Sequence, residues 1–173
     1  MGGVFIIGSI LLSVFLWANL TNPFILVTSF VCLSLAIVGG VDDYIKLKGI
    51  GKYRGLRSRD KMLWQLLIAA LAAVYAYLNP DVTTILDVPF FKDLFIDLGV
   101  FFVFWVVLAV VGSSNAVNLT DGLDGLAIGT TLMVAFTLGA LSYVAGNSNL
   151  SDYLFVPYVP GTGELTVFCA PPL

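Results

Sequence analysis

Residues 24–61 read FILVTSFVCLSLAIVGGVDDYIKLKGIGKYRGLRSRDK, an apolar run that passes directly into a basic one. The apolar part, residues 24–41, is long enough to cross a bilayer as a helix, which needs roughly 20 residues with about 17 tolerated. The basic part holds seven of the eight Lys and Arg residues of the chain. Because positively charged loops stay on the cytoplasmic side of a membrane, this stretch predicts a span followed by a cytoplasmic loop.

The rest of the chain has the same apolar character. Hydrophobic residues make up 59% of the 173 residues and charged residues only 11%, whereas soluble domains carry about 25% charged residues. Further apolar runs predict spans over about residues 4–20, 62–78, 98–111 and 126–145. These runs are continuous rather than alternating, which favours helices over the strands of a barrel. A soluble helical core would need polar helix faces, and the runs have none.

We therefore predict an all-α polytopic membrane protein with five spans that forms one transmembrane domain over residues 1–173. The predicted loops 42–61 and 112–125 are separated by two spans, so both are expected on the cytoplasmic face. The segments 79–97 and 146–164 then lie outside. In the first of them, residues 83–92 predict a short outer β-hairpin, although Pro89 weakens the strand pattern.

Two adjacent carboxylates, Asp42 and Asp43, directly follow the apolar run 24–41. Negative charge near the C-terminal end of a helix opposes the helix dipole, and neighbouring carboxylates repel each other. The pair therefore needs a stabilising partner. One interpretation is Mg²⁺, which binds carboxylates together with substrate phosphates. The other is a solvated helix end neutralised by Lys46.

Polar residues are densest in NAVNLTDGLDGLA, residues 115–127. Helix capping would explain Asp121 and Asp124. It would leave Asn115 and Asn118 unexplained, and their amides suit hydrogen bonds to a base or a ribose. We therefore predict that this stretch binds a ligand.

The basic loop also has two interpretations. By itself it is a positive-inside signal with contact to anionic lipid. Because it directly follows the Asp pair, cations such as Lys52 and Arg54 also suit a diphosphate donor and a lipid phosphate acceptor, since phosphoryl transfer needs metal and cationic groups to neutralise charge.

These stretches together resemble the phospho-N-acetylmuramoyl-pentapeptide transferase family. NAVNLTDGLDGLA is similar to the family signature, and VDDYIK (41–46) is similar to its metal-binding Asp pair. Shorter likenesses are MGG at the start of the chain, RGL (54–56), VPFFKD (88–93) and PGTGEL (160–165). The resemblance extends to about Ala170.

The resemblance implies transfer of phospho-MurNAc-pentapeptide from UDP-MurNAc-pentapeptide to undecaprenyl phosphate, with Mg²⁺ as cofactor and release of UMP. It implies a location in the bacterial cytoplasmic (inner) membrane with the active face cytoplasmic. It also implies catalytic roles for Asp42, Asp43 and Lys46 and metal binding by the two aspartates. Asn118, Asp121 and Asp124 match positions that contact the nucleoside or support the site. Besides the two substrates and the bilayer, a second copy of the chain is a predicted partner, and nucleic acid is not.

The chain departs from the family pattern in its number of spans and its lack of histidine. The family has more spans, a later Gly-Asp metal ligand and a His-rich segment, whereas this sequence predicts five spans and contains no histidine. We therefore expect these 173 residues to be inactive alone. Two other classes stay open. A Mg²⁺-dependent intramembrane prenyltransferase would have no uridine site, and a transporter would need charged or helix-breaking residues within its spans.

Overall fold

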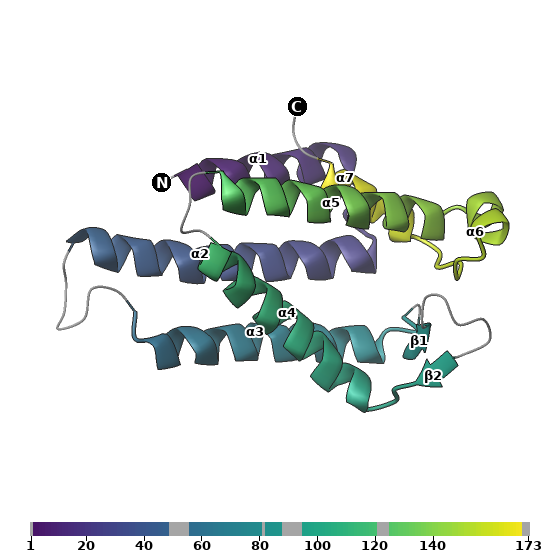
Figure 1. Ribbon diagram of the computed structural model, residues 1–173, viewed down its shortest axis with the longest axis horizontal. Helices are drawn as coiled ribbons and strands as arrows, with labels where there is room; N and C mark the ends of the chain where they lie inside the picture. Colours follow the sequence, from purple (N-terminus) through teal and green to yellow (C-terminus); the bar gives the residue numbers. More distant parts are fainter. Residues whose placement is uncertain (1, 49–55, 81, 88–94, 121–124, 171–173) are drawn as a thin grey trace.

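The computed structural model describes residues 2–48, 56–80, 82–87, 95–120 and 125–170 and shows a bundle of helices (Figure 1). The described residues form five long helices: α1 (Gly2–Trp17), α2 (Pro23–Lys48), α3 (Ser58–Leu78), α4 (Phe101–Thr120) and α5 (Leu126–Ala145). Helices α2 to α5 are each long and apolar enough to cross a membrane, and α1 is a shorter apolar helix. The prediction of an all-α polytopic membrane protein is confirmed.

The predicted hairpin forms, although its second strand lies beyond the predicted range. Strand β1 (Ile85–Asp87) pairs antiparallel with β2 (Phe95–Asp97), so that Leu86 faces Ile96. The Thr84 hydroxyl donates to Asp97 Oδ1 at 2.7 Å, and the Gly99 N–H donates to the same oxygen at 3.0 Å. These two hydrogen bonds hold the pKa of Asp97 below its usual value, and they join the hairpin to the segment that enters α4.

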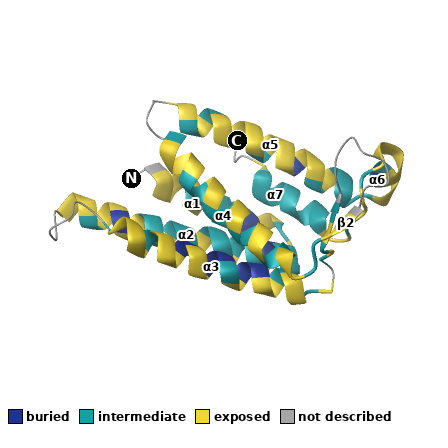
Figure 2. Cartoon of the chain, turned by 60° about the horizontal axis from the view of Figure 1, so that its bottom comes forward, coloured by how far each residue is buried: buried dark blue, intermediate teal, exposed yellow. Residues whose placement is uncertain are grey.

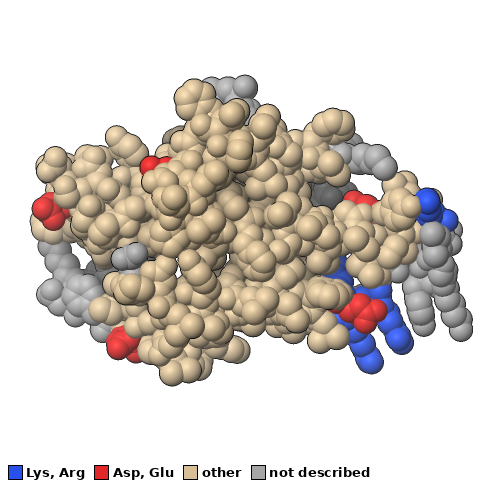
Figure 3. All heavy atoms as spheres, turned by 180° about the vertical axis from the view of Figure 1, so that it is seen from behind, with Lys and Arg blue, Asp and Glu red and all other residues tan. Residues whose placement is uncertain are grey.

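The two ends of the bundle differ in charge. We call one the hairpin end, because it carries β1 and β2 (Figure 1). At the other, the basic end, the described Lys and Arg residues gather, whereas Asp and Glu occur at both ends (Figure 3). The cations described at the basic end are Lys46, Lys48, Arg57, Arg59 and Lys61.

Helical structure extends into both predicted cytoplasmic loops. Helix α2 continues through residues 42–48, because this stretch holds no helix breaker, Lys46 and Lys48 suit the negative end of the dipole, and Asp42 pairs with Lys46 four residues on. Helix α3 begins at Ser58, and α4 runs to Thr120, past the predicted span end at residue 111. Part of the predicted site is therefore helical rather than loop.

Helix α1 ends at Trp17, three residues before the predicted end of the first span. The Asn19 side chain accepts hydrogen bonds from the N–H and hydroxyl of Thr21 at 3.1 and 2.7 Å, which favours a turn there. The Asn22 side chain then accepts from the N–H of Phe24 at 2.9 Å at the start of α2. At 16 residues, α1 is about 24 Å long, shorter than the hydrocarbon core of a bilayer.

Helix α3 lies between α2 and α4, and it supplies much of the buried surface (Figure 2). Its buried residues recur every three or four positions, as on one face of a helix. Several of them are alanines, which let neighbouring helices approach closely in a membrane. The set is Gln65, Ile68, Ala69, Ala72 and Ala73.

The last part of the chain folds back into the bundle at the hairpin end. It comprises α6 (Ser148–Leu154), a 3₁₀ turn η1 (Thr162–Glu164) and α7 (Leu165–Cys169). Helix α7 contacts α5, α1 and α2. The Glu164 carboxylate accepts from the N–H of Asn19 at 3.1 Å, and the Asn22 side chain donates to the carbonyl of Gly161 at 2.8 Å. These bonds tie the turn between α1 and α2 to the segment before α7.

Gly146 directly follows α5, at a position where the backbone leaves no room for a side chain. A Cβ there would lie 2.6 Å from the Cα of Gly163, and closer still to its backbone nitrogen. Gly146→Ala should destabilise the protein by about 1–3 kcal/mol, because one of two backbones must move. Thermal unfolding in detergent would measure the loss. The matched control is Gly129→Ala on the same helix, where a Cβ meets nothing within 4 Å. Equal unfolding temperatures for both variants would contradict the close contact.

Candidate functional site

Asp42 is a buried carboxylate in the last two turns of α2, with 5% of its surface exposed. Its Oδ2 lies 2.7 Å from Lys46 Nζ, and its Oδ1 accepts the backbone N–H of Leu56 at 2.8 Å. A second cation, Lys61 Nζ on α3, lies 3.9 Å from Oδ2. Asp42 therefore joins α2 to the start of α3 and to the residue that precedes that helix.

Asp43 lies in a different environment, although it is the next residue. Successive residues on a helix are about 100° apart, so the two carboxylates leave α2 in different directions. The Asp43 side chain is 72% exposed, and its Oδ1 lies 3.7 Å from Lys46 Nζ. The Lys46 ammonium thus lies between a buried carboxylate and an exposed one. The Asp42–Lys46 pair that the sequence offered as an alternative to a metal is present.

The donor set is compatible with Mg²⁺ in type and number. This ion is usually held by one or two carboxylates, with waters and substrate phosphates completing its shell. Asp43 presents its oxygens to solvent, whereas both oxygens of Asp42 are already engaged by the N–H of Leu56 and by Lys46, so Asp43 is the more accessible ligand of the pair. Within the described ranges, no group of three or more acidic, Cys or His side chains is placed to hold a metal.

Four predicted site residues lie outside the described residues: Lys52, Arg54, Asp121 and Asp124. Their substrate-binding roles remain predictions. The structure does describe their neighbours. Leu56 is held by Asp42, and α5 begins after Gly125, which occupies the N-cap position with a positive φ of 83°. In the sequence, helix capping is one interpretation of Asp121 and Asp124.

The two predicted asparagines lie on the last two turns of α4 at different exposure. Asn118 is exposed, and Asn115 is half-buried. The Asn115 Nδ2 donates to Gln65 Oε1 at 3.0 Å and to the carbonyl of Val111 at 2.8 Å. Asn118 therefore presents its amide for a ligand more freely than Asn115 does.

Gln65 is the residue that sequence reasoning missed. It is 3% exposed, and its Nε2 donates to the Ser114 hydroxyl at 3.1 Å. The sequence does carry a signal for it, because Gln65 is the one amide side chain in the apolar run 62–78. Polar residues within membrane helices usually bond a neighbouring helix.

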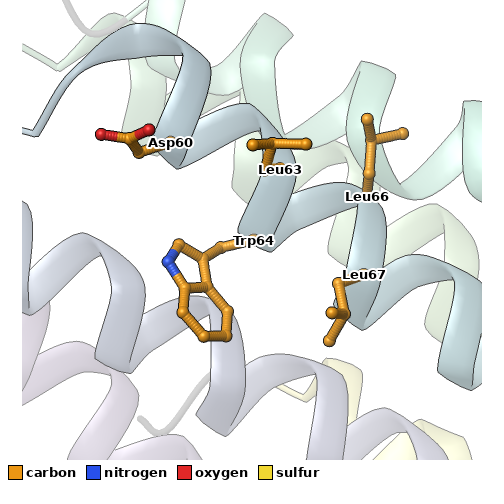
Figure 4. A pocket seen from close by; sticks show the side chains of 5 residues that line it. All are labelled: Asp60, Leu63, Trp64, Leu66 and Leu67. Atoms are coloured by element: carbon orange, nitrogen blue, oxygen red, sulfur yellow. The ribbon is translucent and has the colours of Figure 1, made fainter.

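Helix α3 connects the two halves of the candidate site. Lys61 reaches Asp42 on α2, and Gln65, one turn further, reaches Ser114 and Asn115 on α4. The same stretch carries an apolar hollow of about 680 Å³. Its described lining is Asp60, Leu63, Trp64, Leu66 and Leu67 (Figure 4). This lining is mostly apolar, as expected of a surface that faces lipid.

The sequence model of glycosyl transferase family 4 matches residues 24–168. The chain belongs to this family. The match covers α2 through α5 and most of α7, so the Asp pair and the polar end of α4 are family 4 segments. The family resemblance drawn from the sequence motifs is confirmed.

Curated relatives of this family 4 chain carry the name phospho-N-acetylmuramoyl-pentapeptide-transferase. Those of Oleidesulfovibrio alaskensis and Citrifermentans bemidjiense are 47% and 48% identical to it over 169 residues. That of Thermodesulfovibrio yellowstonii is 43% identical over 171 residues. Each alignment covers 98% of this chain and 47% of the relative. The chain therefore spans about half the length of the curated relatives it matches.

Proposed function

We propose that this chain supplies phosphate-, metal- and nucleotide-binding groups to a transferase of lipid-linked cell-wall precursor synthesis. The reaction moves phospho-MurNAc-pentapeptide from UDP-MurNAc-pentapeptide to undecaprenyl phosphate and releases UMP. The names of the relatives support this reaction. The observation that carries the proposal is the Asp42–Lys46–Asp43 cluster, in which one cation lies between a buried and an exposed carboxylate at the basic end.

The geometry suits phosphoryl transfer between two phosphates. An oxygen of the lipid phosphate attacks the phosphorus that carries the sugar, and the bond from that phosphorus to the oxygen of the leaving UMP breaks. Both substrates are anionic, so cations must neutralise charge as they meet. The Asp42 carboxylate holds Lys46 in place, which leaves its ammonium beside the exposed Asp43. Asp43 would then accept a proton from the lipid phosphate or bind the metal.

Mg²⁺, when bound, would supply further neutralisation of the transferring phosphate and the leaving group. Asp43 would hold the ion, and Asp42 would join it only by releasing Lys46. The uridine portion of the donor is assigned to the exposed amide of Asn118 at the end of α4, because an amide both donates and accepts hydrogen bonds.

The reaction is tested in membranes that hold a full-length protein containing these 173 residues. With UDP-MurNAc-pentapeptide, undecaprenyl phosphate and Mg²⁺, equal amounts of UMP and lipid-linked product are expected. Omitting the lipid phosphate or chelating the metal should stop both. UMP release that continues without undecaprenyl phosphate would indicate hydrolysis and contradict the proposed acceptor. The 173-residue chain by itself is expected to give no product above a vector control.

The proposed sidedness gives a labelling prediction. In a background without Cys32 and Cys169, single cysteines at Lys52 and Leu119 should resist an impermeant thiol reagent in intact cells. Lys52 lies in the predicted cytoplasmic loop 42–61, and Leu119 lies in the predicted cytoplasmic loop 112–125. A cysteine at Asp87 in the hairpin should react. Permeabilised cells serve as the control, because all three positions should then be labelled. Opposite behaviour of Lys52 and Leu119 would show that the two segments do not share a face.

A further inference from the structure

We infer that Gln65 is a positioning residue that fixes the basic end of α4, and with it Asn118, relative to the Asp42 cluster. That the ligand of Asn118 is a uridine nucleotide rests on the proposed function. Both groups of the Gln65 side-chain amide form hydrogen bonds with side chains of α4. Its Nε2 donates to Ser114 Oγ at 3.1 Å, and its Oε1 accepts from Asn115 Nδ2 at 3.0 Å.

Packing by itself does not account for a glutamine at this position. The neighbouring buried positions of α3 are Ile68, Ala69, Ala72 and Ala73, and an apolar side chain at position 65 would complete the same face. Burying an amide without hydrogen-bond partners costs free energy, so a buried glutamine requires such partners. Side-chain hydrogen bonds between membrane helices add little stability on average. Two directional bonds do, however, restrict how α4 can rotate and slide along α3.

The bonded residues of α4 lie one turn before the predicted ligand residue. Ser114 and Asn115 precede Asn118 by four and three positions, so all three share one side of the helix. On α3, Lys61 lies one turn before Gln65 and reaches Asp42 at 3.9 Å. Helix α3 therefore reaches Asp42 through Lys61 and Asn115 through Gln65. The Asn115 amide nitrogen is bonded within the protein, which makes Asn115 a part of this link.

Distances between spin labels test the link in the full-length protein that contains the chain. The labels replace Leu47 on α2 and Leu119 on α4, which are 67% and 82% exposed. Gln65→Met keeps the length of the side chain and removes both hydrogen bonds, so a shifted or broader distance distribution is expected. Gln65→Glu, when protonated, can both donate and accept, and it should restore the original distribution.

The matched control is Thr137→Val, which removes a hydroxyl that bonds its own helix at the carbonyl of Met133. It should leave the label distances unchanged. A distribution that is identical in Gln65→Met and the unsubstituted protein would overturn the inference, whether or not the protein binds nucleotide.

Nucleotide affinity provides a second readout, with UDP as the probe. Gln65→Met should weaken UDP binding about tenfold, while the KM for undecaprenyl phosphate stays the same. In a background that carries both Ser114→Ala and Asn115→Leu, the same substitution should have little further effect, because both hydrogen bonds of Gln65 are already absent. A purely structural role would instead lower the unfolding temperature and change the affinity for both substrates. If the unsubstituted protein binds no UDP, the proposed function fails, and the label distances still decide the positioning role.

Discussion

Asp43→Asn in a full-length protein that contains this chain is expected to reduce transfer at least 100-fold without unfolding it. The carboxylate is 72% exposed and borders Lys46 at 3.7 Å, so its loss should change little in the folded structure. A positioned proton acceptor contributes about 10²–10⁴-fold to a reaction rate, so its removal should cost at least 100-fold. The measurement is the rate of lipid-linked product formation, with thermal unfolding in parallel.

Asp42→Asn should lose a similar share of transfer, and it should also lower the unfolding temperature. This buried carboxylate accepts the N–H of Leu56 and pairs with Lys46, so an uncharged amide in its place should weaken the ion pair that joins α2 to the start of α3. The matched control is Asp60→Asn, the same change at the same end of the bundle in the first turn of α3. The control should remain active. Near-normal turnover in both Asp42→Asn and Asp43→Asn would show that neither carboxylate takes part in the reaction and would contradict the proposed site.

Asn118→Ala is expected to weaken the binding of uridine nucleotides by about 1–3 kcal/mol, or roughly 5- to 150-fold, because it removes a hydrogen-bonding amide. Its side chain is exposed at the end of α4, so the unfolding temperature should stay nearly the same. Binding of UDP and thermal unfolding should be measured on the same samples.

A capping asparagine gives the opposite pattern and serves as the control. Asn147 caps α6, where its Oδ1 accepts the N–H groups of Asn149 and Leu150 at 3.1 and 3.3 Å. Asn147→Ala should cost about 1 kcal/mol of stability and leave UDP affinity unchanged. An Asn118→Ala variant that loses stability but binds UDP normally would show that Asn118 is structural.

The sequence predicted the parts of the fold that depend on local composition. The apolar runs predicted the long helices, and the clustered cations predicted one strongly basic end. The hairpin was also expected, although its second strand lay beyond the predicted segment. Helix ends were less predictable. Residues 42–48 and 112–120 are polar enough to suggest loops, yet they contain no proline and continue their helices.

The candidate site was only partly predictable, because its partners come from distant parts of the chain. The Asp pair and Lys46 lie within five residues, so their proximity follows from helix geometry. The partner of Asp42 at Leu56 is a backbone N–H, which carries no side-chain signal in a sequence. Gln65 could be noticed as a polar residue in an apolar helix, but its pairing with Ser114 and Asn115 depends on how α3 and α4 pack.

The attachments at the hairpin end have a mechanical consequence. Glu164 and Gly161 bond the turn between α1 and α2, and Gly146 packs against Gly163, so α5 is held at the end where it finishes. A 20-residue helix is about 30 Å long, so a tilt of about 5° about that fixed point would move its other end by about 2.6 Å. We therefore expect a small change at the hairpin end, such as a substitution at Gly146, to be magnified at Gly125, where α5 begins within the predicted ligand-binding stretch 115–127.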